Sequence, residues 1–564
     1  MLRLAPLLIV TLLVGPILAG LTMALLPAFG YLPALGGERL SLAPWRELFA
    51  QPGLARSVAV SFASGLVTTA VSLAVVLLFL ASVSGSRLDR WIRRMVAPLL
   101  SLPHAAAAFG LAFLIAPSGL LARLVSPELS GWQRPPDLLI VNDPWGLTLM
   151  AGLVVKEIPF LLLMSLAALP QFDPERRVAM ARSLGYRPMT AWLKVVVPAL
   201  YPLIRLPVYA VIAYATAVVD VALILGPTLP PTLAVSILAW YQDPDLSRRL
   251  VASAGAVLQL GVTASALAVW WCLEGLVARL GRAWLARGGR GQGEQPLRLA
   301  GKGLILLASL TAFVGLAGLA LSSIAGLWRF PDALPQAVTA AHWLRALPTL
   351  AGPVATTALI AIGATLIALA LTLAALENEQ RSGRHPAEGK LLSALTLLYL
   401  PLIVPQIAFL FGLVVVMESL GTRPRLWLVI FGHLLFVLPY VFLSLSEAYR
   451  RFDPRWSQLA LSLGTSRHAV FWRVRLPMLL APLLTAGAVG LAVSIGQYLP
   501  TLLLGAGRIA TVTTEAVSLA AGGNRRVIGV WALVQASLPL VGFLIAVGLP
   551  RLLWSNRRGM RGSL

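Results

Sequence analysis

The fold is decided by the segment KEIPFLLLMSLAALPQFDPERRVAMARSLG, residues 156–185, because a second version of it occurs later in the chain. That version is LFVLPYVFLSLSEAYRRFDPRWSQLALSLG, residues 435–464. Both run from an apolar stretch through Phe-Asp-Pro to Ser-Leu-Gly, so that Gly185 corresponds to Gly464. The pattern predicts an internal duplication whose two copies have the same orientation.

The composition around these copies indicates an all-α integral membrane protein. Hydrophobic residues make up 58% of the 564 residues and charged residues only 12%, which is far more apolar than a soluble core requires. Runs of about 20 apolar residues suffice to cross a hydrocarbon layer of about 30 Å. The chain has twelve such runs, near 5–29, 57–82, 95–116, 146–169, 201–226, 251–278, 303–327, 350–376, 391–417, 426–446, 479–504 and 528–550.

These runs divide into two tandem six-span permease-like domains. We expect the first domain at 1–278, a Gly- and Arg-rich cytoplasmic linker at 279–302 and the second domain at 303–564. The first run is longer than the apolar core of a signal peptide, so it is interpreted as an uncleaved span.

The net charge of +23 is explained by topology rather than by nucleic-acid binding. Lys and Arg are concentrated in the connections that face the cytoplasm if both termini are cytoplasmic, as the positive-inside rule requires. The expected surroundings are therefore a lipid bilayer, with no nucleic acid as partner. A single cysteine, Cys272, excludes an intramolecular disulfide.

Each repeat ends in a polar connection, here named the first loop (173–198) and the second loop (453–477). In the first loop, Asp173 is expected to cap a helix that Gly185 terminates, and a second helix is expected to begin near Pro188 and stop before Pro198. The second loop repeats these signals at Asp453, Pro454, Gly464, Ser466 and Pro477.

Both loops place cations beside small or apolar residues, which favours a docking surface over a solvated connector because the arrangement occurs twice. A helix-turn-helix reader of DNA has similar turn glycines and basic residues. Each loop is tethered closely between two spans, however, and a recognition helix would be held against the bilayer.

The loops resemble the EAA loop of the membrane subunits of binding-protein-dependent ABC importers, whose pattern is Glu-Ala-Ala, three residues, Gly and, further on, Ile-x-Leu-Pro. The Glu position of the pattern is Ala179 in the first loop and Gln458 in the second. The resemblance implies that ATPase coupling involves Ala181, Ser183, Leu184, Gly185 and Pro198, and Ala460, Ser462, Leu463, Gly464 and Pro477.

The motifs IPF and LPY, followed by FDP, are also similar to the fused two-domain permeases of iron(III) and thiamine importers. This resemblance implies a bacterial inner-membrane permease that works with an ABC ATPase homodimer and an extracytoplasmic solute-binding protein. The chain itself is then no enzyme and binds no cofactor, and ATP is used by the partner ATPase. In agreement, its two Gly-Lys pairs, at 301–302 and 389–390, lack the upstream glycine of a phosphate-binding loop.

Polar residues inside predicted spans are candidates for the translocation path, because burying an ionisable group at the centre of a bilayer costs about 2.5–3.5 kcal/mol. These candidates are Lys156, Glu157, Asp220, Gln497 and Tyr498. Lys156 and Asp220 are at similar predicted depths, so they either pair structurally or line the path. The segment GPTLPP, 226–231, forms either a reentrant turn or a plain loop. The histidines are too scattered for a metal site, and no catalytic residue is assigned.

The alternative of another class is a secondary transporter of twelve spans driven by an ion gradient. It would transport solute as a single chain, whereas an importer permease requires its ATPase. A membrane scaffold lacks any supporting motif. The sequence is compatible with iron(III), thiamine-like compounds, polyamines or small oxyanions as the solute.

Overall fold

The computed structural model describes residues 4–83, 102–291, 293–382, 397–522 and 524–554. Within these residues ten helices are long and apolar enough to cross a membrane, or up to twelve if each of two bent helix pairs forms one span. This confirms the predicted all-α integral membrane fold. The described parts of the predicted runs near 95–116 and 391–417 begin at residues 102 and 397.

The first half of the molecule is defined here as α1 to α13. Its long helices are α1 (Ala5–Ala28), α3 (Leu54–Val83), α5 (His104–Ile115), α7 (Leu147–Ala168), α10 (Val197–Ala217) and α13 (Arg248–Ala286). Its shorter elements are η2 (Pro33–Leu35), α2 (Ala43–Phe49), α6 (Leu120–Leu124), η3 (Leu169–Gln171), α8 (Pro174–Ser183), α9 (Pro188–Ala191), η4 (Trp192–Val196), α11 (Asp220–Leu225) and α12 (Leu233–Tyr241).

The second half, α14 to α25, has a corresponding set of six long helices. Its long helices are α14 (Gln295–Ser323), α15 (Ala341–Ser382), α17 (Gln406–Ser419), α18 (Leu426–Arg450), α22 (Leu480–Ile495) and α25 (Arg525–Leu553). Its shorter elements are α19 (Pro454–Ser462), α20 (Arg467–Val470), η5 (Phe471–Arg475), α21 (Leu476–Met478), α23 (Leu499–Leu504), α24 (Val512–Ser518) and η6 (Leu519–Ala521).

The two halves exchange their first helices. Helix α1 packs along α17 of the second half, and α14 packs along α5 of the first half. Glycines make both crossings close: a Cβ on Gly412 would lie 1.7 Å from the Gly20 carbonyl oxygen, and one on Gly315 would lie 2.9 Å from the Gly110 carbonyl carbon. Small residues allow helix backbones to approach in this way within a membrane. The halves are therefore joined by two equivalent glycine crossings.

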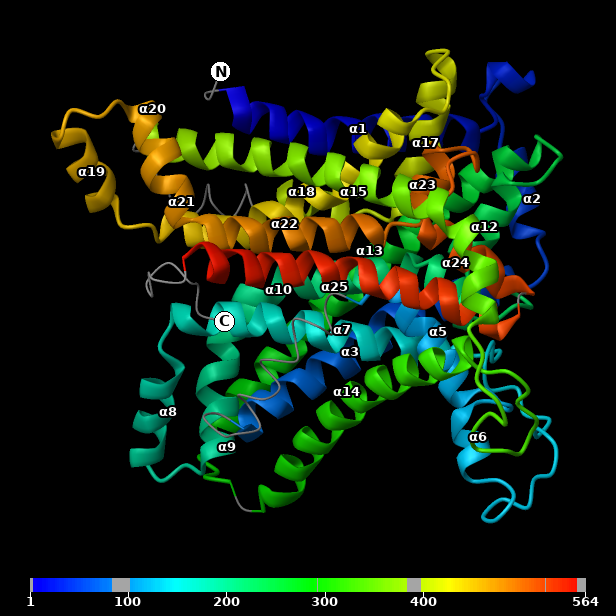
Figure 1. Cartoon of the computed structure of the whole chain (residues 1–564), viewed down its shortest axis with the longest axis horizontal. Coiled ribbons are helices and arrows are strands. Elements are labelled where there is room, and N and C mark those ends of the chain that lie inside the picture. Colours follow the sequence, from blue (N-terminus) through cyan, green and yellow to red (C-terminus); the bar gives the residue numbers. More distant parts are fainter. Residues whose placement is uncertain (1–3, 84–101, 292, 383–396, 523, 555–564) are drawn as a thin grey trace.

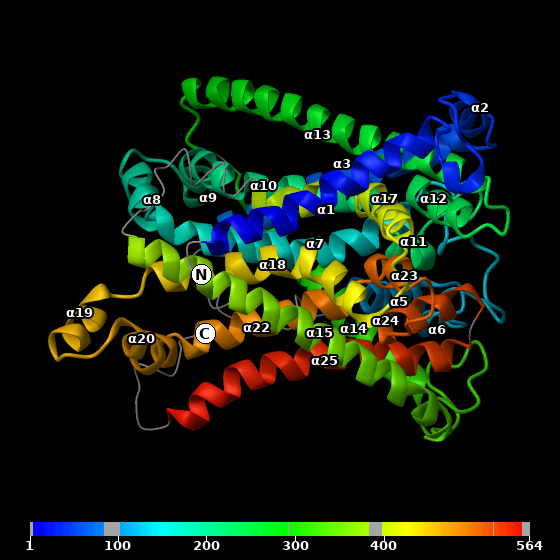
Figure 2. The ribbon, with the colours of Figure 1, turned by 90° about the horizontal axis from the view of Figure 1, so that it is seen from above.

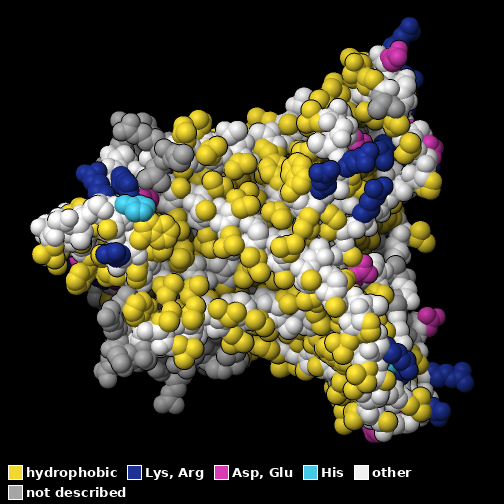
Figure 3. All heavy atoms as spheres, turned by 45° about the horizontal axis from the view of Figure 1, so that its top comes forward, with side chains coloured by type: hydrophobic (Ala, Val, Ile, Leu, Met, Phe, Trp, Pro, Cys, Tyr) yellow, Lys and Arg dark blue, Asp and Glu magenta, His cyan; other side chains and the backbone are white. Residues whose placement is uncertain are grey.

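Both loops project from the same end of the helix bundle, here named the loop end (Figures 1 and 2). Helix α1 begins and α25 ends there, whereas α2, α6, α12 and α24 lie at the opposite end (Figure 1). Lys and Arg side chains gather toward the two ends, with a mainly apolar belt between them (Figure 3). This distribution is typical of a protein whose middle is surrounded by lipid.

The connection between the halves is shorter than predicted. Helix α13 continues to Ala286 and α14 begins at Gln295, so only 287–294 of the predicted linker 279–302 lie between the two helices. The Gly- and Arg-rich composition predicted a linker, and its first part, 279–286, extends α13 by about two turns. The name connection is kept below for residues 287–294.

Candidate functional site

Both loops begin with the expected helix cap. The Asp173 side chain accepts a hydrogen bond from the Arg176 backbone N–H at 3.3 Å, and Asp453 accepts one from the Arg455 N–H at 2.9 Å. The proline that follows each aspartate lies in the first turn, where its missing N–H is not required. The predicted starts of α8 and α19 are thus confirmed.

Gly185 and Gly464 end these two helices in the same left-handed conformation, with φ of +85° and +83°. The N–H of the residue after each glycine bonds back to Ala181 or Ala460, at 3.3 Å and 3.2 Å respectively. This is the hydrogen-bond pattern of a helix that ends in a left-handed residue, a conformation that glycine adopts without strain. The two loops therefore turn through the same backbone geometry.

The expected stop before the second proline of each loop is wrong. In the first loop the helix from Pro188 continues to Ala217 as one candidate span. In the second it continues past Pro477 to Met478 and then bends by 73° into α22. Both helices contain a π-helical turn, η4 or η5, just before the proline. The wider turn accommodates a residue that has no N–H to donate, and such turns often mark functional positions.

The predicted coupling residues form the tips and bases of the loops. Leu184 and Leu463 are 66% and 77% exposed beside the turn glycines. Ala181 is buried and Ala460 is half-buried, each beneath the turn. Pro477 is half-buried. The other predicted coupling residues are exposed: Ser183, Gly185, Pro198, Ser462 and Gly464. Ala179 and Gln458, at the position of the family's glutamate, are exposed as well.

Residues that the sequence did not single out anchor the first loop. Glu294, in the connection, accepts hydrogen bonds from the Thr190 N–H at 2.7 Å and the Thr190 hydroxyl at 2.6 Å. Lys194 of η4 donates to the carbonyls of Trp284 and Gly289, at 3.2 Å and 2.9 Å. Both charged side chains are buried. The first loop is thus fixed to the end of α13 and to the connection.

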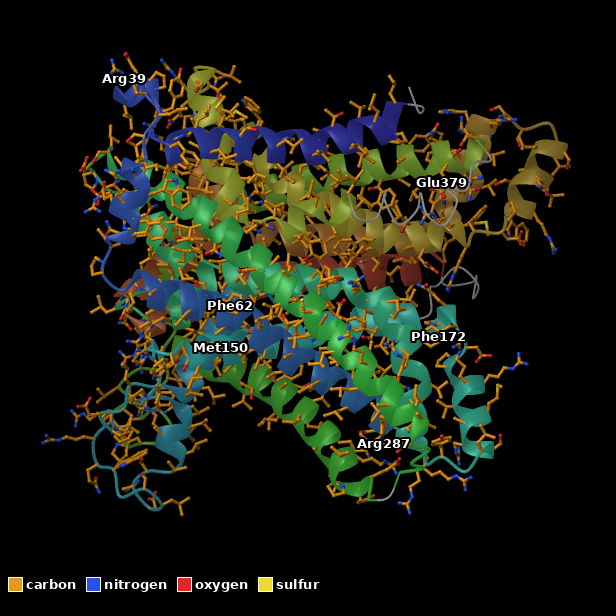
Figure 4. All side chains as sticks on the ribbon, turned by 180° about the vertical axis from the view of Figure 1, so that it is seen from behind. Arg39, Phe62, Met150, Phe172, Arg287 and Glu379 are labelled. Atoms are coloured by element: carbon orange, nitrogen blue, oxygen red, sulfur yellow. The ribbon has the colours of Figure 1, made fainter. Side chains whose placement is uncertain are left out.

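A different set of buried charges anchors the second loop. Glu377, near the end of α15, accepts hydrogen bonds from Arg475 of η5 and from the Tyr449 hydroxyl. Arg475 also donates to the Ser457 hydroxyl of α19 at 3.0 Å. Arg450 and Glu379 form a bidentate pair at 2.9 Å and 3.0 Å close by. Figure 4 shows Glu379 near the second loop, Phe172 and Arg287 near the first, and Arg39 at the opposite end.

The spans that follow the loops are broken inside the bundle. Helix α10 ends at Ala217, and Asp220 begins the short helix α11 after two extended or irregular residues. In the second half α22 ends at Ile495, and Gln497 and Tyr498 precede α23. Broken helices near the middle of a membrane protein commonly bind the transported solute, because their free backbone groups face a polar space. Three of the five predicted path residues lie at these breaks.

A buried polar cluster surrounds the first break. The His104 Nε2 and Glu157 Oε1 atoms are 3.2 Å apart, and the Tyr214 ring centroid lies 4.8 Å from that of His104. Lys156, Glu157 and Asp220 are all buried. Glu157 pairs with His104 at this cluster. Sequence reasoning did not include His104 among the path candidates, because it considered the histidines only as possible metal ligands.

The halves are in contact at the end opposite the loops. A cavity of about 360 Å³ lies there, with Tyr241, Asp243 and Arg249 from the first half and Glu418 and Thr422 from the second among its lining residues. Arg249 and Glu418 approach to 3.5 Å across the boundary. Burial raises the pKa of Tyr241 to about 12, so its hydroxyl stays protonated.

The segment 226–231 is non-helical between α11 and α12, as its prolines predict.

Comparison with known proteins agrees with this architecture. The family described as binding-protein-dependent transport system inner membrane component matches residues 392–549. The inner membrane ABC transporter permease protein YnjC of Escherichia coli is 31% identical over 524 residues, which cover 93% of each chain.

Shorter matches involve two other permeases. The spermidine/putrescine transport system permease protein PotC of Escherichia coli is 29% identical over 124 residues, 22% of this chain and 44% of PotC. The putative 2-aminoethylphosphonate transport system permease protein PhnV of Salmonella typhimurium is 29% identical over 217 residues, 38% of this chain and 79% of PhnV. These relatives support the importer permease over the alternative of an ion-gradient-driven transporter. The chain belongs to the family of multi-pass inner-membrane permeases of ABC importers.

Proposed function

We propose that this chain forms the whole membrane pathway of its importer, as two fused six-span permease domains at 1–278 and 303–564. In this arrangement it is similar to the fused permeases of iron(III) and thiamine importers. Each half has its own loop, its own broken span and its own exchanged first helix. One chain then supplies both of the membrane domains that a pair of ATPase subunits requires.

The two loops dock on the two copies of a separate ATPase, which uses the ATP. The observation that carries this proposal is the exposure of Leu184 and Leu463, at 66% and 77%, on equivalent turns at the same end of the molecule. Exposed leucines on polar, aqueous-facing loops favour burial against another protein. Closure of the ATPase dimer would move the loops and, through η4 and η5, the broken spans beyond them.

This orientation places the loop end and both chain termini in the cytoplasm. The opposite end then faces the extracytoplasmic solute-binding protein, and the Arg249–Glu418 contact lies on that side. A solute delivered there would pass the two breaks, where Asp220, Gln497 and Tyr498 lie, and we expect Lys156 and Glu157 to line the path with them. The path is chemically unequal, because Asp220 at the first break has no acidic counterpart among Gln497, Tyr498 and Leu499.

The test combines Leu184→Asp with Leu463→Asp in the full chain, co-expressed with its ATPase. We expect co-purification of the ATPase to fall by at least tenfold, because two carboxylates would be desolvated in the docked state. Leu129→Asp is the matched control, since Leu129 is 84% exposed and follows α6, which lies at the opposite end (Figure 1). Normal ATPase recovery with the double variant would refute the docking role of the loops.

A second experiment tests whether transport by this chain requires the ATPase. The permease is reconstituted in liposomes with and without the ATPase, and the ligand-loaded binding protein is supplied outside. Uptake is expected only when the ATPase and ATP are both present. Uptake by the permease alone under a proton or sodium gradient would overturn the proposal.

A further inference from the structure

The second helix of the first loop lacks a capping side chain within the loop itself. Its N-cap residue is Arg187, whose side chain accepts no capping hydrogen bond. The equivalent residue of the second loop is Ser466, whose hydroxyl oxygen accepts a hydrogen bond from the Ala469 N–H at 3.2 Å. Helix starts with unsatisfied N–H groups are destabilised unless another acceptor replaces the missing cap.

Glu294 of the connection provides that acceptor. Its carboxylate accepts the Met189 N–H at 3.3 Å and the Thr190 N–H at 2.7 Å, the second and third residues of α9. It also accepts the Thr190 hydroxyl at 2.6 Å, and the Glu294 residue is only 7% exposed. The negative charge at a helix N-terminus adds a favourable interaction with the helix dipole. Glu294 thus caps α9 from more than 100 residues away in the sequence.

Two further contacts join the same segments. Lys194 lies one turn along the helix and donates to the Trp284 and Gly289 carbonyls, the first of which belongs to the last turn of α13. The Arg187 N–H donates to the Arg290 carbonyl at 3.0 Å. The residue that corresponds to Lys194 in the second loop is Arg473, which is exposed. The first loop thus combines two caps: Glu294 caps the start of α9, and Lys194 caps the carbonyls at the end of α13.

We propose that Glu294 is a positioning residue for ATPase coupling, because it fixes the first loop to the connection between the two halves. This inference rests on the proposed docking role of the loops. Glu294 is also the N-cap residue of α14, which belongs to the second half. A displacement of the first loop is consequently transmitted to the ends of both α13 and α14, whereas the second loop is held by Glu377 of α15, in its own half.

The claim that Glu294 caps α9 is tested by hydrogen–deuterium exchange on the full-length permease in nanodiscs, without ATPase. In Glu294→Gln, the amides of 189–191, the residues of α9 that carry an N–H, are expected to exchange about fivefold faster, as for the loss of one helix cap. Arg187→Ser has a backbone suited to a local cap, with φ −68° and ψ 153°, and is expected to restore slow exchange in the double variant. The amides of 467–470 serve as the internal control and should not change.

A second pair of variants tests the contact without altering a charge. A Cβ on Gly291 would lie 2.2 Å from the Thr190 hydroxyl oxygen, whereas one on Gly293 meets nothing within 4 Å. Both glycines have positive φ, +86° and +72°, so Gly293→Ala controls for backbone strain. Gly291→Ala should accelerate exchange at 189–191 more than Gly293→Ala does.

The functional readout is ATP hydrolysis by the assembled complex, stimulated by ligand-loaded binding protein. We expect stimulation to fall at least threefold in Glu294→Gln and to recover in Glu294→Gln with Arg187→Ser. Unchanged exchange at 189–191, equal acceleration at 467–470, or no recovery with Arg187→Ser would each overturn the inference. Failure of the docking proposal would instead appear as normal ATPase binding in the Leu184/Leu463 variants, while the exchange results on the isolated permease would stand.

Discussion

The first and second loops have the same shape but are held by different parts of the chain. Both consist of a capped helix, a left-handed glycine and a second helix that continues through a π-helical turn. The first is anchored by Glu294 and Lys194 to the connection between the halves, and the second by Glu377 and Arg475 to α15. The repeated sequence thus determines the geometry of a loop, and residues outside the repeated motif determine what the loop moves with.

The largest expected effect comes from removing the charge of Glu377. Its side chain is 6% exposed and that of Arg475 is 10% exposed, so Glu377→Gln leaves a buried guanidinium without its carboxylate. A loss of this kind costs about 3 kcal/mol. Hydrogen exchange across 457–475 should accelerate by about two orders of magnitude. Equal acceleration across 174–191 would show that the two anchors do not act separately.

A smaller effect is expected from changes at the turn glycines. Valine at Gly185 or Gly464 must adopt a positive φ, at a cost of about 1–2 kcal/mol. Each single variant should lower ATP hydrolysis coupled to binding protein by at least fivefold, to the same extent in both loops. Gly421→Val is the matched control, because its φ is +66° and nothing lies within 4 Å, but it is outside both loops. A comparable loss of coupled ATP hydrolysis with Gly421→Val would show that the loop turns have no special role in coupling.

Ser466→Ala and Arg187→Ala together test whether the second helices of the two loops are capped by different residues. Loss of this local cap should cost about 1 kcal/mol and accelerate exchange at 467–470 about fivefold. Arg187→Ala, at the equivalent position, should leave exchange at 189–191 unchanged because Glu294 provides the cap there. If both substitutions have the same effect, the two helices are capped alike and the comparison fails.

The smallest effect is expected for the Arg450–Glu379 pair. The side chains are 30% and 16% exposed, so screening by water reduces their interaction to about 0.5 kcal/mol. Arg450→Gln should shift the thermal midpoint of the permease slightly at low salt and not at about 1 M salt. A shift that is independent of salt would indicate a packing role for the arginine instead.

The spans, the duplication and the loop turns were predictable because each depends on local sequence. Apolar run length indicates spans, and aspartate, proline and glycine spacing indicates the starts and ends of α8 and α19. The stop before Pro198 was predicted wrongly, since proline normally ends a helix and a π-helical turn has no comparable signal.

The anchors could not be predicted, because they join residues distant in the chain. Glu294 and Thr190 are 104 residues apart, and Glu377 and Arg475 are 98 apart. No periodicity connects these residues, and Glu294 lies in a segment whose composition indicated only a linker. The same applies to His104 and Glu157, which meet only after two spans have packed together. A missing cap at Arg187, compared with Ser466, was the single available hint.

Cross-linking tests the central claim that these loops contact the ATPase. The exposed Cys272 is first replaced by serine, and a single cysteine is then introduced at Leu184, Leu463 or, as a control, Leu229. In the assembled complex, a maleimide cross-linker is expected to join Leu184→Cys and Leu463→Cys to an ATPase subunit, and not Leu229→Cys. Absence of both loop cross-links in a complex that still hydrolyses ATP in response to the binding protein would contradict the account.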